Sequence, residues 1–524
     1  MADSATRHVV ALARRGLLRG ATGLSALAAL QPSLARSLTR GDPFTLGVSS
    51  GDPWPDGVVI WTRLAPDPME AGGGMGPAPV EVGWEVAEDE RMARIVQRGS
   101  FTATPALCHS VHVELRGLQP GRSYFYRFRA LGHESRTGRT RTAPEPGSET
   151  PIRFLNAGCQ NFEHGHFTAW RHAAAEEDID FVFHYGDYIY EHAGRPIGGR
   201  GWGPVVRSHH GSEATTLEDY RARYAQYHLD PDLAAAHAAH PFVSTYDDHE
   251  IENNWVGLIS QRDGGRRFPV ATPPEVFALR AAAALQAWYE NMPVRDAALP
   301  RGTGITAFRR LRFGRNLDLH VLDTRRFRDD QPCGDGVVPP CEARAREDAQ
   351  VLGTVQEAWL REGLARGSAR WQVLGQQIFL APRQFGQDSF NMDSWDGYPA
   401  ARARLLAMLA GHDAAVLTGD VHRAWANNLQ ERPDGPAVAV EFVGTSITSE
   451  GDGSEAQPSA AATMAANPHL TFHSNRRGYT LHIARADRLE AIYRAVPYVQ
   501  QPDAPREDRG HFVTLAGRPG VVPA

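Results

Sequence analysis

The 524-residue sequence contains no lysine, so all 55 of its basic side chains are arginine. A Walker-type phosphate loop, Schiff-base chemistry and a serine–lysine dyad each require a lysine amine, and the sequence therefore excludes them. The net charge of −6 gives no basic footprint for nucleic acid. Any phosphate group must be held by arginine, by backbone amides or by a metal ion.

Long apolar runs are also missing, because no stretch of the sequence is apolar for long enough to cross a bilayer. Cysteine is scarce, with four residues in the chain. Cys333 and Cys341 bracket a loop with glycine and proline, and they are candidates for a disulfide in an oxidising compartment. The remaining composition is that of a globular protein, and the length predicts two domains.

Residues 1–35 have the features of an export signal. Arg14 and Arg15 resemble the twin-arginine consensus, a short and mildly apolar segment follows them, and a small-residue cleavage site ends at Ala35. The alternative is a basic amphipathic helix. The signal predicts a secreted or periplasmic protein that the twin-arginine machinery exports after folding.

Residues 44–142 alternate short β-favouring runs with turn residues, which predicts an N-terminal fibronectin- or Ig-like β-sandwich. This region contains a G-x-S-x-G match centred on Ser49. A nucleophile elbow must pass from a strand into a helix, whereas this match runs into Asp-Pro-Trp-Pro, so we interpret it as a coincidental turn. The linker at 141–151 leads into a second domain, which we place at 151–510.

Strands and helices alternate in the second domain, which is typical of an α/β fold. Side chains of the kinds that bind metals follow its strands, at the sheet edge where open α/β folds bind ligands. They are Cys159, Asp187, Tyr190, Asp248, His249, Gln376, Gln377, Asp420 and His422. Each residue alone is compatible with a capped turn, but their recurrence at one edge predicts a two-metal hydrolytic site. The charged segment within 317–331 is either a solvated, salt-bridged loop or a substrate-binding loop.

The order of the motifs GCQ, GDYIYE, DDHExxNN, LDTR, WQxLGQQ and TGDVHRAW, with a β-domain before them, resembles the PhoD-type alkaline phosphatase/phosphodiesterase family. The resemblance extends over nearly all of the chain after the signal. It implies an α/β fold with a four-layer αββα, calcineurin-like metallophosphatase core. It also implies activity on phosphomonoesters or phosphodiesters, with Fe3+ and Ca2+ as cofactors.

The resemblance further implies an iron side and a calcium side of the site, with Asp187 bridging the two metals. The implied iron ligands are Cys159, Tyr190 and His422. The implied calcium ligands are Asp248, Asp420 and Asn254, with Asn253 as the alternative to Asn254. His249 would stand outside the metal shell as a general acid or transition-state stabiliser, and the role of the Gln376 pair stays open.

These roles predict a secreted phosphoric ester hydrolase that cleaves phosphate esters by attack of a metal-bound hydroxide. One alternative is a secreted phospholipase D with the same metals. Another is a non-catalytic secreted binding protein, although a pure binder would not need the whole set of candidate ligands. We expect the β-domain to shape the approach to the site, with carbohydrate binding as the alternative.

Overall fold

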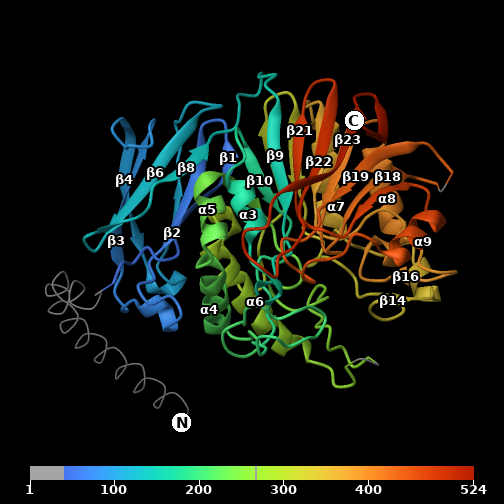
Figure 1. Cartoon of the computed structure of the whole chain (residues 1–524), viewed down its shortest axis with the longest axis horizontal. Coiled ribbons are helices and arrows are strands. Elements are labelled where there is room, and N and C mark those ends of the chain that lie inside the picture. The colour runs from blue at the N-terminus through green and yellow to red at the C-terminus, as the bar shows by residue number, and fades with distance from the viewer. Residues whose placement is uncertain (1–40, 266–267, 433) are drawn as a thin grey trace, which may run out of the picture.

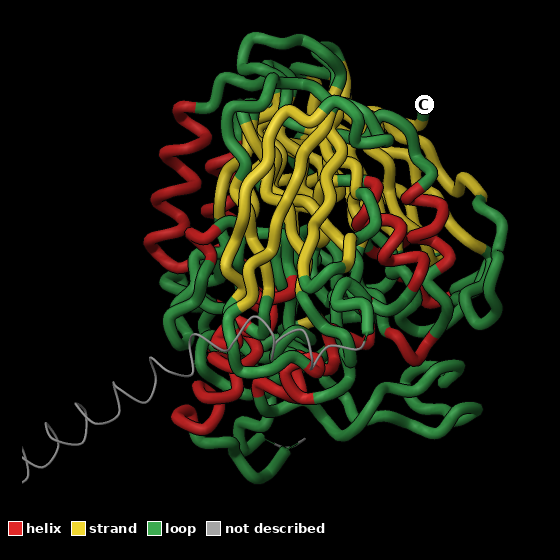
Figure 2. The backbone as a smooth tube through the Cα atoms, turned by 90° about the vertical axis from the view of Figure 1, so that its left-hand side faces the viewer, coloured by secondary structure: helices red, strands yellow, loops and turns green. Residues whose placement is uncertain are grey.

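The computed structural model describes residues 41–265, 268–432 and 434–524 (Figure 1). The predicted export signal at 1–35 lies outside these residues. None of the described helices is both long enough and apolar enough to cross a membrane. Figure 2 views the molecule from the side of the N-terminal domain, where upright strands lie in front.

The N-terminal domain packs one antiparallel sheet against another. The first sheet contains β3 (Val80–Ala87), β4 (Ile95–Ala103), β6 (Ser123–Ala130), β7 (His133–Glu134) and β8 (Gly138–Arg141). The second contains β1 (Val48–Trp54), β2 (Gly57–Arg63) and β5 (Ser110–Glu114). Their inward-facing side chains, among them Val82, Tyr126 and Val111, form one buried core, as the alternating sequence pattern predicts.

The second of these sheets continues into the second domain, because β1 pairs in parallel with β11 (Pro241–Ser244). The resulting large sheet has the order β24-β23-β22-β21-β9-β10-β11-β1-β2-β5. One of the two sheets of the predicted sandwich is therefore an extension of the large sheet of the second domain. Residues 48–51 of the G-x-S-x-G match lie in β1 and Gly47 directly precedes it, so the match is neither a nucleophile elbow nor the turn that we expected. The Ser49 hydroxyl hydrogen-bonds to His237 Nδ1 at 2.8 Å.

The other strands of the large sheet come from the two ends of the second domain. They are β9 (Ile152–Ala157), β10 (Phe181–His184), β21 (Arg477–Ala484), β22 (Arg488–Val496), β23 (Glu507–Leu515) and β24 (Arg518–Pro523). The sheet thus extends past residue 510, where we placed the end of the domain. Strands β9, β10 and β11 are parallel, so their carboxyl ends meet at one edge.

A second sheet faces the first and is built from the middle of the chain, in the order β12-β13-β15-β17-β19-β18-β20. Its strands are β12 (Arg309–Phe313), β13 (Leu317–Val321), β15 (Trp371–Gly375), β17 (Ala414–Thr418), β18 (Ala424–Gln430), β19 (Ala437–Val443) and β20 (Leu470–Ser474). A buried apolar layer joins the sheets, with Phe181 and Phe183 from one and Val373 and Phe442 from the other.

Helices cover the outer face of each sheet. Those on the large sheet are α3 (Thr168–Ala174), α4 (Leu217–His228), α5 (Pro231–Ala239) and α6 (Pro274–Asn291). Those on the second sheet are α7 (Gly353–Arg366), α8 (Pro399–Leu409) and α9 (Pro458–Ala466). The predicted helix–sheet–sheet–helix core is therefore confirmed.

A short two-stranded antiparallel sheet lies beside the second sheet, formed by β14 (Val337–Val338) and β16 (Phe390–Asn391). Cys333 and Cys341, the two cysteines that the sequence suggested as a pair, form a disulfide next to it. Cys108 and Cys159 are buried and free.

Candidate metal centre

The candidate ligands lie in the loops that follow the parallel strands of both sheets. Cys159 follows β9, Asp187 follows β10 and Asp248 follows β11, all in the large sheet. Asp420 and His422 follow β17 in the second sheet. The site is thus assembled at the edge where the two sheets meet, as the sequence pattern predicts.

The ring of Tyr185 explains how these loops approach one another so closely. A Cβ on Gly158 would lie 2.4 Å from this ring, and one on Gly419 or Gly444 would lie 2.2 or 2.7 Å from it. Real Cβ atoms do not reach such distances, so the glycines are required by the packed ring. Gly158 directly precedes Cys159, and Gly419 directly precedes Asp420.

The site loops also hold several side chains on left-handed backbone. The residues with positive φ include Cys159 (50°), Asp187 (54°), Asn254 (55°), Asp420 (66°) and His422 (54°). For residues other than glycine this conformation costs about 1–3 kcal/mol and persists where surrounding contacts enforce it. The concentration of such residues at one edge therefore indicates a functional site.

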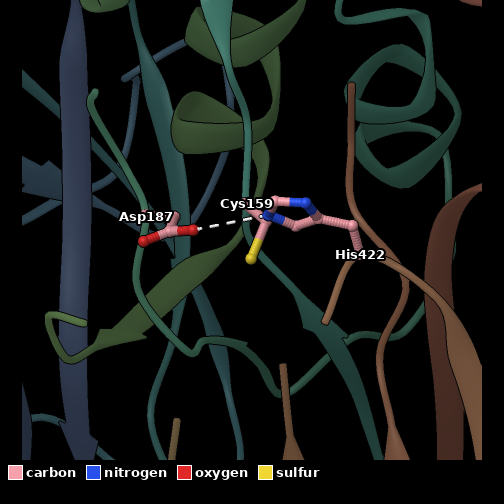
Figure 3. Close-up of side chains that lie close together, drawn as sticks. All are labelled: Cys159, Asp187 and His422. Atoms are coloured by element: carbon pink, nitrogen blue, oxygen red, sulfur yellow. Dashed lines mark ion pairs between the residues drawn. The ribbon is translucent and has the colours of Figure 1, made fainter. Parts of the chain in front are cut away.

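One cluster brings together Cys159, Asp187 and His422, whose ligand atoms all lie within 4.8 Å of one another (Figure 3). The distance from Asp187 Oδ2 to His422 Nε2 is 3.7 Å. The Tyr190 hydroxyl donates to Asp187 Oδ2 at 2.8 Å and lies 3.2 Å from His422 Nε2. The structure thus places all four residues of the predicted iron side around one point.

The chemistry of this cluster fits a bound cation. Asp187 Oδ1 is buried and has no hydrogen-bond partner among the described residues, which is costly for a carboxylate. Burial, reinforced by the Asp187 carboxylate, raises the pKa of the Cys159 thiol and of the Tyr190 phenol well above their usual values. A metal ion would satisfy the free oxygen and stabilise the ionised forms of both groups.

A second cluster contains Asp247, Asp248 and Asp420, again with ligand atoms within 4.8 Å. The backbone N–H of Asn254 donates to Asp248 Oδ2 at 2.7 Å, which ties this residue to the cluster. The side-chain amide of Asn253 instead donates to Gln261 Oε1 at 2.9 Å. Asn254 is therefore tied to this cluster through its backbone, whereas the side chain of Asn253 is tied to Gln261.

Arg325 is the buried counter-charge of this second cluster, and the sequence interpretation missed it. Its side chain is fully buried, with Nε 2.6 Å from Asp247 Oδ1 and Nη1 3.0 Å from Asp393 Oδ2. Its Nη2 lies 3.6 Å from Asp248 and 3.5 Å from Asp420. The segment 317–331 is thus salt-bridged, as one interpretation held, but at Arg325 it is not solvated. The LDTR motif, which places an arginine in the loop after β13, was the sequence feature that could have identified Arg325.

His249 forms a charged pair with Glu191 at the same site. Its Nδ1 lies 2.7 Å from Glu191 Oε2, and a ring nitrogen lies within 4.8 Å of carboxylate oxygens of Asp187 and Asp248. Burial alone would lower the pKa of His249, but the Glu191 carboxylate, followed by Asp248 and Asp187, raises it well above its usual value. Glu191 closes the GDYIYE motif, and we had assigned it no role.

Gln376 and Gln377 do not offer free ligand atoms. Gln376 donates to Thr418 Oγ1 at 2.8 Å and accepts from the indole N–H of Trp395 at 3.1 Å. Gln377 donates to Thr245 Oγ1 at 2.9 Å, which connects the two sheets. These hydrogen bonds indicate a structural role for Gln376 and Gln377.

A cavity of about 460 Å³ opens onto the centre and is lined by Asp187, Asp248, His249, Asp420 and His422 among others. Its lining residues fall between positions 187 and 463, so the N-terminal domain does not line it. We expected the β-domain to shape the approach to the site, but none of its residues lines this cavity.

The fold and the clustered ligands at the edge of its two sheets define a metallophosphatase. The PhoD-like phosphatase family matches residues 154–493, and the N-terminal domain of PhoD-like phosphatases matches residues 29–144. The chain belongs to the PhoD-like phosphatase family. The predicted family and the predicted class, a metal-dependent phosphoric ester hydrolase, are thereby confirmed.

Individual relatives agree with this assignment. The chain is 43% identical to the alkaline phosphatase D of Bacillus subtilis (strain 168) over 517 residues, which cover 97% of this chain and 86% of the relative. A solved structure of PhoD, also 43% identical, superposes with a TM-score of 0.88 over 93% of this chain and 92% of its own. A purple acid phosphatase from yellow lupin (Lupinus luteus) seeds shares the fold, with a TM-score of 0.51 at 15% identity over 88% of this chain and 74% of its own.

Proposed function

We propose that this chain hydrolyses phosphate mono- or diesters at a centre that holds iron(III) beside calcium. The observation that carries the proposal is the cluster of Cys159, Asp187, Tyr190 and His422. In this cluster Asp187 Oδ1 is buried without a hydrogen-bond partner among the described residues. Thiolate, phenolate, carboxylate and imidazole together suit iron. The oxygens of Asp248, Asp420 and Asn254 suit calcium, which prefers oxygen ligands.

When bound, the two ions would lower the pKa of a water molecule and offset negative charge on the phosphoryl oxygens. The protein supplies the remaining chemistry. Asp187 groups with Cys159 and His422 and also with Asp248 and His249, so its carboxylate would help to hold both ions. His249, held protonated by Glu191, is placed at the cavity wall to donate a proton to the oxygen of the leaving alcohol.

A substrate panel combined with metal analysis tests this function. Protein loaded with iron and calcium should hydrolyse p-nitrophenyl phosphate or bis-p-nitrophenyl phosphate, and Asp187→Asn should remove the activity while the fold is retained. Preferential release of choline from phosphatidylcholine would instead identify a phospholipase D. Failure to hydrolyse any of the three would overturn the proposal.

We further propose that the chain is exported by the twin-arginine route. Arg14, Arg15 and the small-residue site at Ala35 support this, as does the Cys333–Cys341 disulfide, since disulfides persist in oxidising compartments. Changing Arg14 and Arg15 to lysine should leave a folded precursor in the cytoplasm. Normal export of that variant would contradict the assignment.

A further inference from the structure

The cavity wall contains an arginine whose guanidinium forms no ion pair or hydrogen bond with the described residues. Arg383 is 6% exposed and lines the same cavity as the metal ligands. Its Nε is buried without a hydrogen-bond partner, and among the described residues no carboxylate or carbonyl accepts from its guanidinium. Burying a charge without a hydrogen-bond partner is energetically costly, which suggests that this group binds a ligand.

Aromatic packing holds this guanidinium in place. Its central carbon lies 4.1 Å from the ring centre of Phe379 and 4.9 Å from that of Phe385, with Trp425 at 5.8 Å. These are cation–π distances, which fix the position of the group without neutralising it. The backbone N–H of Arg383 also donates to Asp396 Oδ2 at 3.0 Å, so the loop itself is anchored. Burial lowers the pKa of Arg383 to about 10, and the group therefore stays charged at neutral pH.

The neighbouring arginine is arranged differently. Arg423 also lines the cavity, but its Nη2 lies 3.0 Å from Glu450 Oε2, so its charge is already paired. The polar side chains of Gln457, Ser459 and Thr463 complete this part of the wall. A cavity of about 460 Å³ lies within the ~300–1,000 Å³ range of sites that hold drug-sized ligands, which leaves room beyond a single phosphate.

We propose that Arg383 binds a second phosphate group of the substrate while the scissile phosphate lies at the metal centre. The proposal rests on the proposed function and narrows it to phosphodiesters that carry another phosphate close to the cleaved bond. A planar guanidinium can bind phosphate oxygens through two parallel N–H donors. This matches a desolvated arginine whose guanidinium forms no hydrogen bond with a described carboxylate, although Asp396, Asp420 and Glu441 lie near enough to raise its pKa. Arg383 would then set substrate preference without taking part in bond cleavage.

Two chromogenic esters test the proposal: the p-nitrophenyl ester of thymidine 5′-phosphate with a free 3′-hydroxyl, and the same ester with a 3′-phosphate. Release of p-nitrophenol reports cleavage at the 5′-phosphate alone. The unmodified enzyme should have a kcat/KM about 10- to 100-fold higher for the 3′-phosphorylated ester, the range expected for a hydrogen bond to a charged group. Arg383→Gln should remove this preference and leave the 3′-hydroxyl ester nearly unaffected, and Arg383→Lys should restore part of it.

Arg344→Gln is the matched control. Arg344 also stacks on a ring, 4.1 Å from the centre of Phe390, but it donates to the Asp396 carbonyl and does not line the cavity. This variant should keep the full preference. A preference that survives in folded Arg383→Gln, or that is absent from the unmodified enzyme, overturns the proposal while the proposed function stands. Failure to cleave either ester would instead count against the proposed function.

Inhibition of the unmodified enzyme gives an answer that does not depend on how the variants fold. Thymidine 3′,5′-bisphosphate should inhibit about 10-fold more strongly than thymidine 5′-phosphate, because it alone supplies the second phosphate for Arg383. Equal inhibition constants would contradict the proposal even if both Arg383 variants failed to fold.

Discussion

Glu191 Oε2 and His249 Nδ1 lie 2.7 Å apart in a buried ion pair at the edge of the metal centre. The other oxygen of Glu191 accepts the backbone N–H of Asn253 at 2.9 Å, so the carboxylate is fixed on both sides. The pair therefore both orients the imidazole and keeps it protonated.

Glu191→Gln should weaken catalysis through His249. Without the carboxylate, the pKa of His249 falls, so the protonated form is lost at a lower pH and the alkaline limb of the kcat–pH profile should move toward lower pH. Phenyl phosphate, which has a poor leaving group, should lose more activity than p-nitrophenyl phosphate. An unchanged pH profile would show that Glu191 does not act through this histidine.

His249→Ala should reduce kcat by ~10²- to 10⁴-fold, the usual range for losing an acid–base group. Iron and calcium contents should stay unchanged, since His249 is placed outside the proposed metal shell. Metal analysis of the purified variant checks this directly. Loss of either metal would make His249 a ligand instead.

Arg325→Met should destabilise the fold. The change removes the cation that faces Asp247 and Asp393, and breaking one partner of a buried ion pair typically costs ~3–5 kcal/mol. Added calcium should recover part of the lost Tm, because a divalent cation can replace the missing charge. Arg346→Met, which removes an exposed partner of Asp348, should leave Tm unchanged and serves as the control. Equal Tm values for the two variants would show that Arg325 has no special role.

His112 predicts part of the acid sensitivity of the fold. Its Nε2 lies 3.0 Å from the carbonyl oxygens of Tyr289 and Met292, and burial lowers its pKa to about 4. As the pH falls below 6.5, His112 becomes protonated in the unfolded chain, whereas in the folded protein it stays neutral until about pH 4. The free energy of unfolding therefore decreases between pH 6.5 and pH 4. The loss between pH 7 and pH 5 is about 2 kcal/mol for this one group.

His112→Gln should keep a donor but lose the titration, so its free energy of unfolding should fall less between pH 7 and pH 5 than that of the unmodified protein. Chemical denaturation at the two pH values measures the difference. Parallel losses in both proteins would place the acid sensitivity in other buried histidines, such as His228, whose pKa burial lowers to about 3.

The sequence predicted the architecture because its signals are local. Alternating strands, glycines before ligand residues and polar strand ends specify both the layered core and the edge that carries Cys159, Asp187 and Asp420. It did not show that β1 joins β11, since that pairing depends on two strands far apart in the chain. The partners of buried charges were missed for the same reason. Arg325 meets Asp393, and Glu191 meets His249, only after the chain folds.

Cys159 and Tyr190 make the identity of the metals the central question, and the visible absorption spectrum of the purified enzyme answers it most directly. If Tyr190 binds iron(III) as a phenolate, charge transfer should colour the protein, and metal analysis should find iron and calcium. Tyr190→Phe should bleach the main band, Cys159→Ser should shift or weaken it, and calcium chelation should abolish activity while much of the colour remains. A fully active, colourless protein that contains zinc alone would contradict the iron–calcium account.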